Sequence, residues 1–151
     1  MLEWNLLCEL VKDVVEKQQF LDEHLLAMHT IMPNTVRHVL PLLDSLFCSE
    51  YMEEESVLGK FELWRCCYGE IVVVSPSRTK EKTCVVVPSV PFCSCKQFCH
   101  SLYRSRDTGD CFCQHIVLAL FVIEQKTCRI RHMSVEEWTL QVSKLLIHYG
   151  A

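Results

Sequence analysis

The sequence predicts an α+β fold, in which N-terminal helices, a small antiparallel β-sheet, a cysteine-rich module and C-terminal helices follow one another. Three observations support this prediction. Apolar residues recur at helical spacing through the first part of the chain, and β-branched runs follow them. A Cys-x-Cys pair and a Cys-x-His pair then precede a long apolar stretch. We therefore divide the chain into a helical region, 1–50, and a region, 51–151, that carries the sheet, the module and the last helices.

The first region is interpreted as three helices. Apolar residues between positions 2 and 15 alternate with charged ones at the spacing of an amphipathic helix. Asp22 is placed to cap a second helix, and Asn34 is placed to cap a third. Pro41 lies within the third helix, and we expect it to bend or divide that helix, because proline lacks an amide hydrogen and clashes with the preceding turn.

The second region begins with three expected strands. Residues 57–68 alternate between apolar and polar types, and residues 71–74 and 84–87 are β-branched runs. The segment 76–80, Pro-Ser-Arg-Thr-Lys, predicts a hairpin-like turn between the last two strands. The order of strand, turn and strand indicates antiparallel pairing.

Two helices are expected to close the chain. The first runs from about residue 113 to residue 126 and is strongly apolar. The second starts at Ser134, where Ser134-Val135-Glu136-Glu137 has the pattern of a capping box, with the serine and the last glutamate each bonding to the other's backbone amide.

The chemistry of the chain is concentrated in Cys93, Cys95, Cys113 and His115. Thiolate sulfur and neutral imidazole are good zinc ligands, and four of them complete a tetrahedron. An extended or knuckle backbone can turn both sulfurs of Cys-x-Cys to one side, and the first turn of a helix can direct Cys113 and His115 inward. The sequence therefore predicts a closed Zn²⁺ site, which is structural because a catalytic zinc keeps an open coordination position.

Some alternatives remain open for the ligand set. Cys99, His100 and Cys111 lie nearby and could replace a proposed ligand, and Cys111-x-Cys113 would repeat the first spacing. The residues between the two pairs form a polar stretch that we expect to be an exposed loop. We assign the cysteines far from the motif to packing, and these are Cys8, Cys48 and Cys128.

Composition limits the remaining functions. The formal charge is −4, so any contact with DNA requires a local basic patch or a partner. The chain has 11 cysteines and no basic start followed by an apolar run, which favours an intracellular metal binder over a secreted disulfide scaffold. Neither a phosphate-binding glycine loop nor a metalloprotease or deaminase motif occurs, so we do not expect an enzyme.

The spacing Cys93-x-Cys95 followed by Cys113-x-His115 resembles the SWIM zinc-finger signature, and residues 93–98 and 113–120 resemble its zinc-binding module. The chain as a whole is similar in length and layout to the small SWIM-domain subunit of the Shu complex, with further likeness at 22–26 and 40–44. One position departs from the SWIM pattern, because Leu118 stands where a small residue is common.

The resemblance implies a scaffold subunit in the nucleus. It implies a heterodimer with a RecA-like recombinase paralogue, which supports recombinase filaments on single-stranded DNA during homologous recombination repair of DNA damage. Contact with single-stranded DNA would then be made through the complex. The alternative is a zinc finger that binds nucleic acid directly through its zinc loop, using basic residues at 78–82, 96–106 and 126–132.

Overall fold

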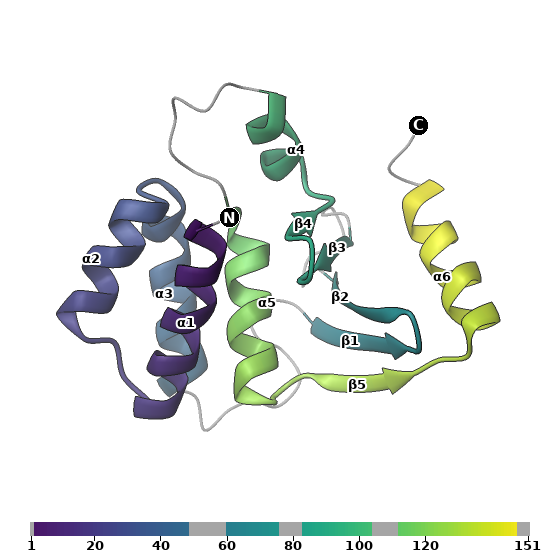
Figure 1. Cartoon of the computed structure of the whole chain (residues 1–151), viewed down its shortest axis with the longest axis horizontal. Helices are drawn as coiled ribbons and strands as arrows, with labels where there is room; N and C mark the ends of the chain where they lie inside the picture. Colours follow the sequence, from purple (N-terminus) through teal and green to yellow (C-terminus); the bar gives the residue numbers. More distant parts are fainter. Residues whose placement is uncertain (1, 49–59, 76–82, 104–111, 148–151) are drawn as a thin grey trace.

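The computed structural model describes residues 2–48, 60–75, 83–103 and 112–147, and its architecture is α+β as predicted (Figure 1). Three N-terminal helices lie on one side of a five-stranded sheet, with a long apolar helix between them and the strands. The last helix lies on the other side of the sheet. The elements are α1 (Leu2–Lys17), α2 (Asp22–Ile31), α3 (Thr35–Cys48), β1 (Lys60–Cys66), β2 (Gly69–Ser75), β3 (Cys84–Val87), β4 (Phe92–Cys93), α4 (Lys96–Tyr103), α5 (Gln114–Gln125), β5 (Arg129–His132) and α6 (Val135–Ile147).

The sheet is mixed, with strand order β4-β3-β2-β1-β5. β1 to β4 pair in antiparallel fashion, as expected, and β1 and β2 form a hairpin in which Cys66 pairs with Gly69. Gly69 has a φ of +147°, in the region that favours glycine. β5 is different, because it runs parallel to β1. The predicted antiparallel pairing is therefore found for β1 to β4, and the sheet is mixed only at this edge, where α5 carries the chain back across the sheet before β5 begins.

Two apolar layers cover the two faces of the sheet. Alternate strand residues point to opposite faces. Leu63, Val72 and Val86 join the larger core with α5 and the N-terminal helices, whereas Trp64 and Val73 join a smaller cluster with α6. The buried residues of α5 lie all around the helix, and they are Ile116, Val117, Leu118, Ala119, Phe121 and Val122. A helix that is apolar on every side is buried on every side, so α5 is the centre of the fold.

Two helix caps and one proline-containing helix differ from what the sequence predicts. The N-cap of α2 is Leu21 and not Asp22, which is the first helical residue. Pro41 does not divide α3, which is one helix from Thr35 to Cys48. The capping box at α6 is half formed: the Glu137 amide donates to Ser134 Oγ, but the Glu137 carboxylate pairs with Arg131 at 2.6 Å. Residues 57–59 and the expected turn at 76–80 lie outside the described residues.

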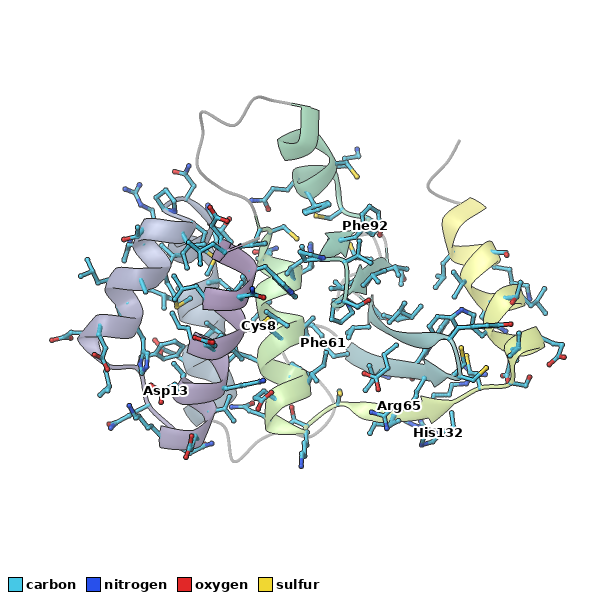
Figure 2. All side chains as sticks on the ribbon, viewed as in Figure 1. Cys8, Asp13, Phe61, Arg65, Phe92 and His132 are labelled. Carbon is cyan, nitrogen blue, oxygen red and sulfur yellow. The ribbon has the colours of Figure 1, made fainter. Side chains whose placement is uncertain are left out.

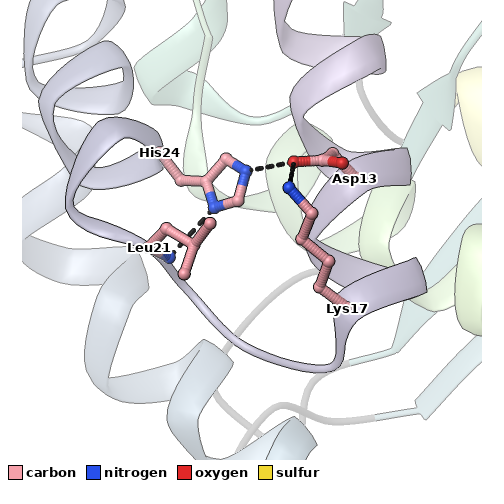
Figure 3. Close-up of polar contacts among 4 residues, drawn as sticks. All are labelled: Asp13, Lys17, Leu21 and His24. Atoms are coloured by element: carbon pink, nitrogen blue, oxygen red, sulfur yellow. Dashed lines mark hydrogen bonds and ion pairs between the residues drawn. The ribbon is translucent and has the colours of Figure 1, made fainter.

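A polar clasp joins α1 to the start of α2 (Figure 3). His24 is buried, its Nδ1 accepts a hydrogen bond from the Leu21 amide at 3.0 Å, and its Nε2 lies 2.6 Å from Asp13 Oδ2. Because Nδ1 accepts a backbone N–H, the neutral imidazole carries its proton on Nε2 and donates it to Asp13. Lys17 Nζ binds the same carboxylate oxygen at 3.0 Å. The clasp therefore fixes the turn between the two helices.

The clasp predicts acid sensitivity that depends on Asp13. Hydrogen bonds from Lys17 and then from His24 lower the pKa of this carboxyl below its usual 3.8. A carboxyl with a lowered folded pKa adds stability above its unfolded pKa, and this stability is lost as pH falls through the lowered value. We expect Asp13→Asn to unfold at lower urea concentration than the wild type at neutral pH. The difference should shrink below pH of about 4.

The control for this prediction is Asp44→Asn on α3, where the carboxylate is exposed and has no ion pair with a described residue. This variant should follow the wild type at every pH. A difference between Asp13→Asn and the wild type that did not shrink at all on acidification would contradict the assignment, because protonation of the Asp13 carboxylate removes its ion pair.

Candidate metal centre

The four predicted ligands come together at one place. Ligand atoms of Cys93, Cys95, Cys113 and His115 all lie within 4.8 Å of one another. Ligands about 2.3 Å from a central ion in a tetrahedron lie about 3.8 Å apart, so this group is close to the size that a tetrahedral metal requires. The three cysteines are buried and His115 is partly buried. The group could hold a metal ion, as the spacing of the two pairs predicts.

The first pair lies on a turn between β4 and α4. Cys93 ends β4, and Ser94 is tied to β3 by two hydrogen bonds, Ser94 N to Val85 O at 3.0 Å and Val85 N to Ser94 Oγ at 2.9 Å. Backbone amides of the turn point at the two sulfurs. The Cys95 amide donates to Cys93 Sγ at 3.5 Å, and the Phe98 amide donates to Cys95 Sγ at 3.3 Å. Such N–H···S contacts favour thiolate sulfur.

The second pair lies at the start of α5. Cys113 is the N-cap of the helix and His115 stands in its first turn, as the sequence predicts. The residue before this cap is anchored to the helical region, because Thr35 Oγ1 donates to the Phe112 carbonyl at 2.7 Å across a sequence separation of 77 residues. The Trp4 and Phe112 rings also meet, with centroids 5.6 Å apart. The N-terminal helices thus hold the end of α5 that carries the ligands.

The anchor of Phe112 predicts the effect of a small substitution. Thr35→Val keeps the shape of a buried side chain but leaves the Phe112 carbonyl without its donor. An unsatisfied buried polar group costs about 1–3 kcal/mol, so the free energy of unfolding should fall by that amount. Urea unfolding measures it. Thr30→Val is the matched control, since Thr30 makes an equivalent bond to a helix carbonyl but is exposed. Equal losses from both variants would contradict the assignment.

The protons of the metal-free group are shared unequally. Hydrogen bonds with Cys113 and then Cys93, and a weaker one with His115, lower the pKa of Cys95. The pKa of Cys93 is raised instead, by its hydrogen bonds with Cys113 and Cys84. Burial alone would lower the pKa of His115, but its contacts with Cys113 and Cys95 outweigh burial and raise this pKa to about 10. The group thus favours a thiolate beside an imidazolium, and a metal that binds must displace protons.

His115 carries a second sign of metal binding. Its Nδ1 atom is buried and has no hydrogen-bond partner among the described residues. A buried ring nitrogen without a partner is costly, and a bond to a metal, or a reorientation of the ring on metal binding, would remove that cost. The donor set and this orphaned atom both fit a soft divalent cation.

The structure also bears on the alternative ligands. Cys99 stands on α4 and its thiol approaches the Cys93 carbonyl at 4.0 Å, and it is not part of the four-ligand group. The segment from Lys96 to Tyr103 is helical, so the expectation of a loop throughout is wrong there. The His100 side chain and Cys111 lie outside the described residues. Leu118 stands where a small residue is common in the SWIM pattern. Both Leu118 and Ala119 are buried, so α5 packs with a leucine at this position.

Sequence reasoning missed one sulfur beside the group. Cys84 on β3 is buried and shares a side-chain hydrogen bond with Cys93. No short motif links these two cysteines. Only the sheet register brings them together. In the pairing of β3 with β4, Cys93 lies opposite Val86, and Cys84 is two residues before Val86 and therefore on the same face of the sheet. Cys84 is a neighbour of the ligands and not a member of the set.

A second group of metal-ligating residue types belongs to the clasp. Asp13, Glu23 and His24 lie close together, but both nitrogens of His24 are already engaged and Lys17 holds the Asp13 carboxylate. A cation there would have to displace an ammonium and the Nε2 proton, so this cluster is a structural contact between two helices.

All helices in the described part of the chain are too short or too polar to cross a membrane. The cysteines whose side chains the structure describes are free thiols, and these are Cys8, Cys66, Cys67, Cys84, Cys93, Cys95, Cys99, Cys113 and Cys128. Comparison of the chain with models of protein families, with curated proteins and with solved structures gives no match.

Proposed function

We propose that this chain is a non-catalytic zinc scaffold, a SWIM-type subunit that pairs with a RecA-like recombinase paralogue in the nucleus. The heterodimer would promote assembly or stability of recombinase filaments on single-stranded DNA in homologous recombination repair. The observation that carries the proposal is the buried group of three cysteines and one histidine, which supplies four ligands from the protein and leaves no position for a substrate. The partner and the process come from the resemblance of the motif and layout to the Shu subunit.

Zinc is the metal that best suits this donor set. Soft thiolates with one imidazole in a tetrahedral arrangement select zinc over magnesium, calcium or manganese, which prefer oxygen ligands. When bound, zinc would supply no reaction but would connect β4, the start of α4 and the start of α5. The chain's own residues position the ligands: Ser94 fixes the first pair to β3, and Thr35 fixes the second pair to α3.

The first experiment measures the metal. Native mass spectrometry of the purified chain, expressed with zinc and with cobalt, should show one ion per chain. The cobalt form should have the intense absorption of tetrahedral thiolate ligation. A stoichiometry well below one, or a cobalt spectrum typical of oxygen ligands, would overturn the zinc assignment whatever the partner is.

The second experiment tests the scaffold role. The chain is affinity-purified from a nuclear extract, and a RecA-like protein is expected among the recovered proteins in near-equal amount. The isolated chain should bind single-stranded DNA weakly, and the complex should bind more tightly. Tight binding by the isolated chain that falls steeply with salt would instead favour direct nucleic-acid binding. Recovery of no RecA-like protein would overturn the proposed pairing.

A further inference from the structure

β5 is an edge strand whose outer side is open in the described part of the chain. It pairs with β1 on one side, and the strand order ends with it. All four of its residues are exposed, and Ile130 keeps 45% of its surface accessible. An open edge presents unpaired backbone N–H and C=O groups to any extended segment. Arg65 and His132 lie beside each other on this rim of the sheet (Figure 2).

Three arginines lie at this edge, and two of them are already paired with glutamates. Arg131 pairs with Glu137, and Arg65 pairs with Glu70. Arg129 lies opposite Glu62 in the register, yet it forms no ion pair with a described residue. The Glu62 carboxylate accepts a hydrogen bond from Trp64 Nε1 at 2.6 Å. Arg129 therefore offers its guanidinium to an incoming group.

The faces of β5 define the pattern of the segment that would fit. Arg129 and Arg131 point to the α6 face, since Arg131 lies 5.8 Å from the ring centre of Trp64, a residue of that face. Ile130 lies between them and points to the opposite face. Cross-strand neighbours share a face, and opposite charges on one face stabilise the pairing. The complementary strand has acidic residues at alternate positions and apolar residues between them.

We infer that β5 is a docking edge for an extended acidic segment of a partner protein, which adds to the sheet as a sixth strand. Backbone hydrogen bonds supply the pairing, Arg129 and Arg131 select the acidic residues, and Ile130 contacts the apolar residue between them. The arginines on this short strand also discourage pairing with neutral or basic strands. This inference is independent of the zinc assignment and of the recombination role.

The test uses the full-length chain and a short fluorescein-labelled peptide that alternates glutamate with valine. Fluorescence anisotropy should show saturable binding of this peptide. Arg129→Glu should weaken it about tenfold, since charge reversal replaces an attractive cross-strand pair by a repulsive one. Arg129→Gln should have a smaller effect. Arg37→Glu, an equal change of charge at an exposed position on α3, should leave binding unchanged.

Two further probes separate strand pairing from simple charge attraction. The same peptide with N-methyl groups on alternate backbone nitrogens keeps its charge but cannot pair along that edge, and it should lose binding. An oligothymidine of equal charge should compete poorly. Absence of peptide binding, equal binding of the N-methylated peptide, equal competition by oligothymidine, or equal effects of the Arg129 and Arg37 variants would each overturn the inference.

Discussion

Replacing Cys113 by alanine is expected to release the metal and to unfold the part of the chain that the four ligands hold together. Cys113 is buried and caps α5, so one substitution removes a ligand from the centre of the group. Apparent zinc-binding free energies at structural sites are about 10–16 kcal/mol, and this energy belongs to folding. β4 has 2 residues and α4 has 8, too few for either to be stable alone.

The measurement combines native mass spectrometry with amide hydrogen exchange. The variant should carry no zinc, and α4 and the first turn of α5 should exchange much faster than in the wild type. Cys128→Ala is the matched control, because this half-buried cysteine lies outside the ligand group and should leave zinc content unchanged. Full zinc content in Cys113→Ala would show that another residue ligates in its place, and Cys111 would be the first to examine.

A pair of substitutions at His115 separates a metal role from a packing role. His115→Ala should bind zinc much more weakly, because only three protein ligands remain and water must take the fourth position. His115→Cys should keep the zinc, since thiolate is as good a zinc ligand as imidazole. A packing role would predict failure of both variants, because cysteine fills much less space than histidine. Acidification should release the ion from the wild type, because protons compete for the thiolates and for the imidazole whose pKa the site raises to about 10.

The candidate site was predictable because its signal is short in sequence. Cys93 and Cys95 are two residues apart, as are Cys113 and His115, so each pair is positioned by a local turn or helix start. The apolar run after His115 predicts that the second pair enters the core with α5. Cys84 escaped prediction because its approach to Cys93 depends on the pairing of β3 with β4, a property of the sheet and not of either segment.

The same distinction explains the fold. Helices α1 to α3 and α5 follow from amphipathic or continuous apolar patterns, and β2 and β3 follow from β-branched runs. β5 could not be recognised, because Arg129-Ile130-Arg131-His132 has one apolar residue and is exposed throughout. An edge strand with little burial leaves no hydrophobic period to read. The cap of α2 was misassigned to Asp22, because the N-cap is Leu21, which has no capping side chain, and the buried His24 accepts the Leu21 amide instead.

A second substitution, Phe121→Ala, is expected to destabilise the core around α5 strongly without removing the metal. Phe121 is fully buried, and its ring packs against that of Phe20 with centroids 5.7 Å apart. Truncation leaves a cavity in the larger core beside Phe20, and such changes cost about 3–5 kcal/mol. Since a domain of this kind is stable by about 5–15 kcal/mol in total, urea unfolding at saturating zinc should show a large loss.

Phe61→Ala provides the comparison for this substitution, because Phe61 is only half-buried at the edge of the same core and should lose less stability. Folded Phe121→Ala protein should still bind one zinc ion, since its four ligands are intact. That is the reverse of Cys113→Ala, which should lose the ion while α1 and the centre of the sheet keep their slow amide exchange. Zinc loss from folded Phe121→Ala would mean that α5 transmits packing at Phe121 to its first turn, two helical turns away. Equal stability of the two phenylalanine variants would mean that α5 is not the centre of the core.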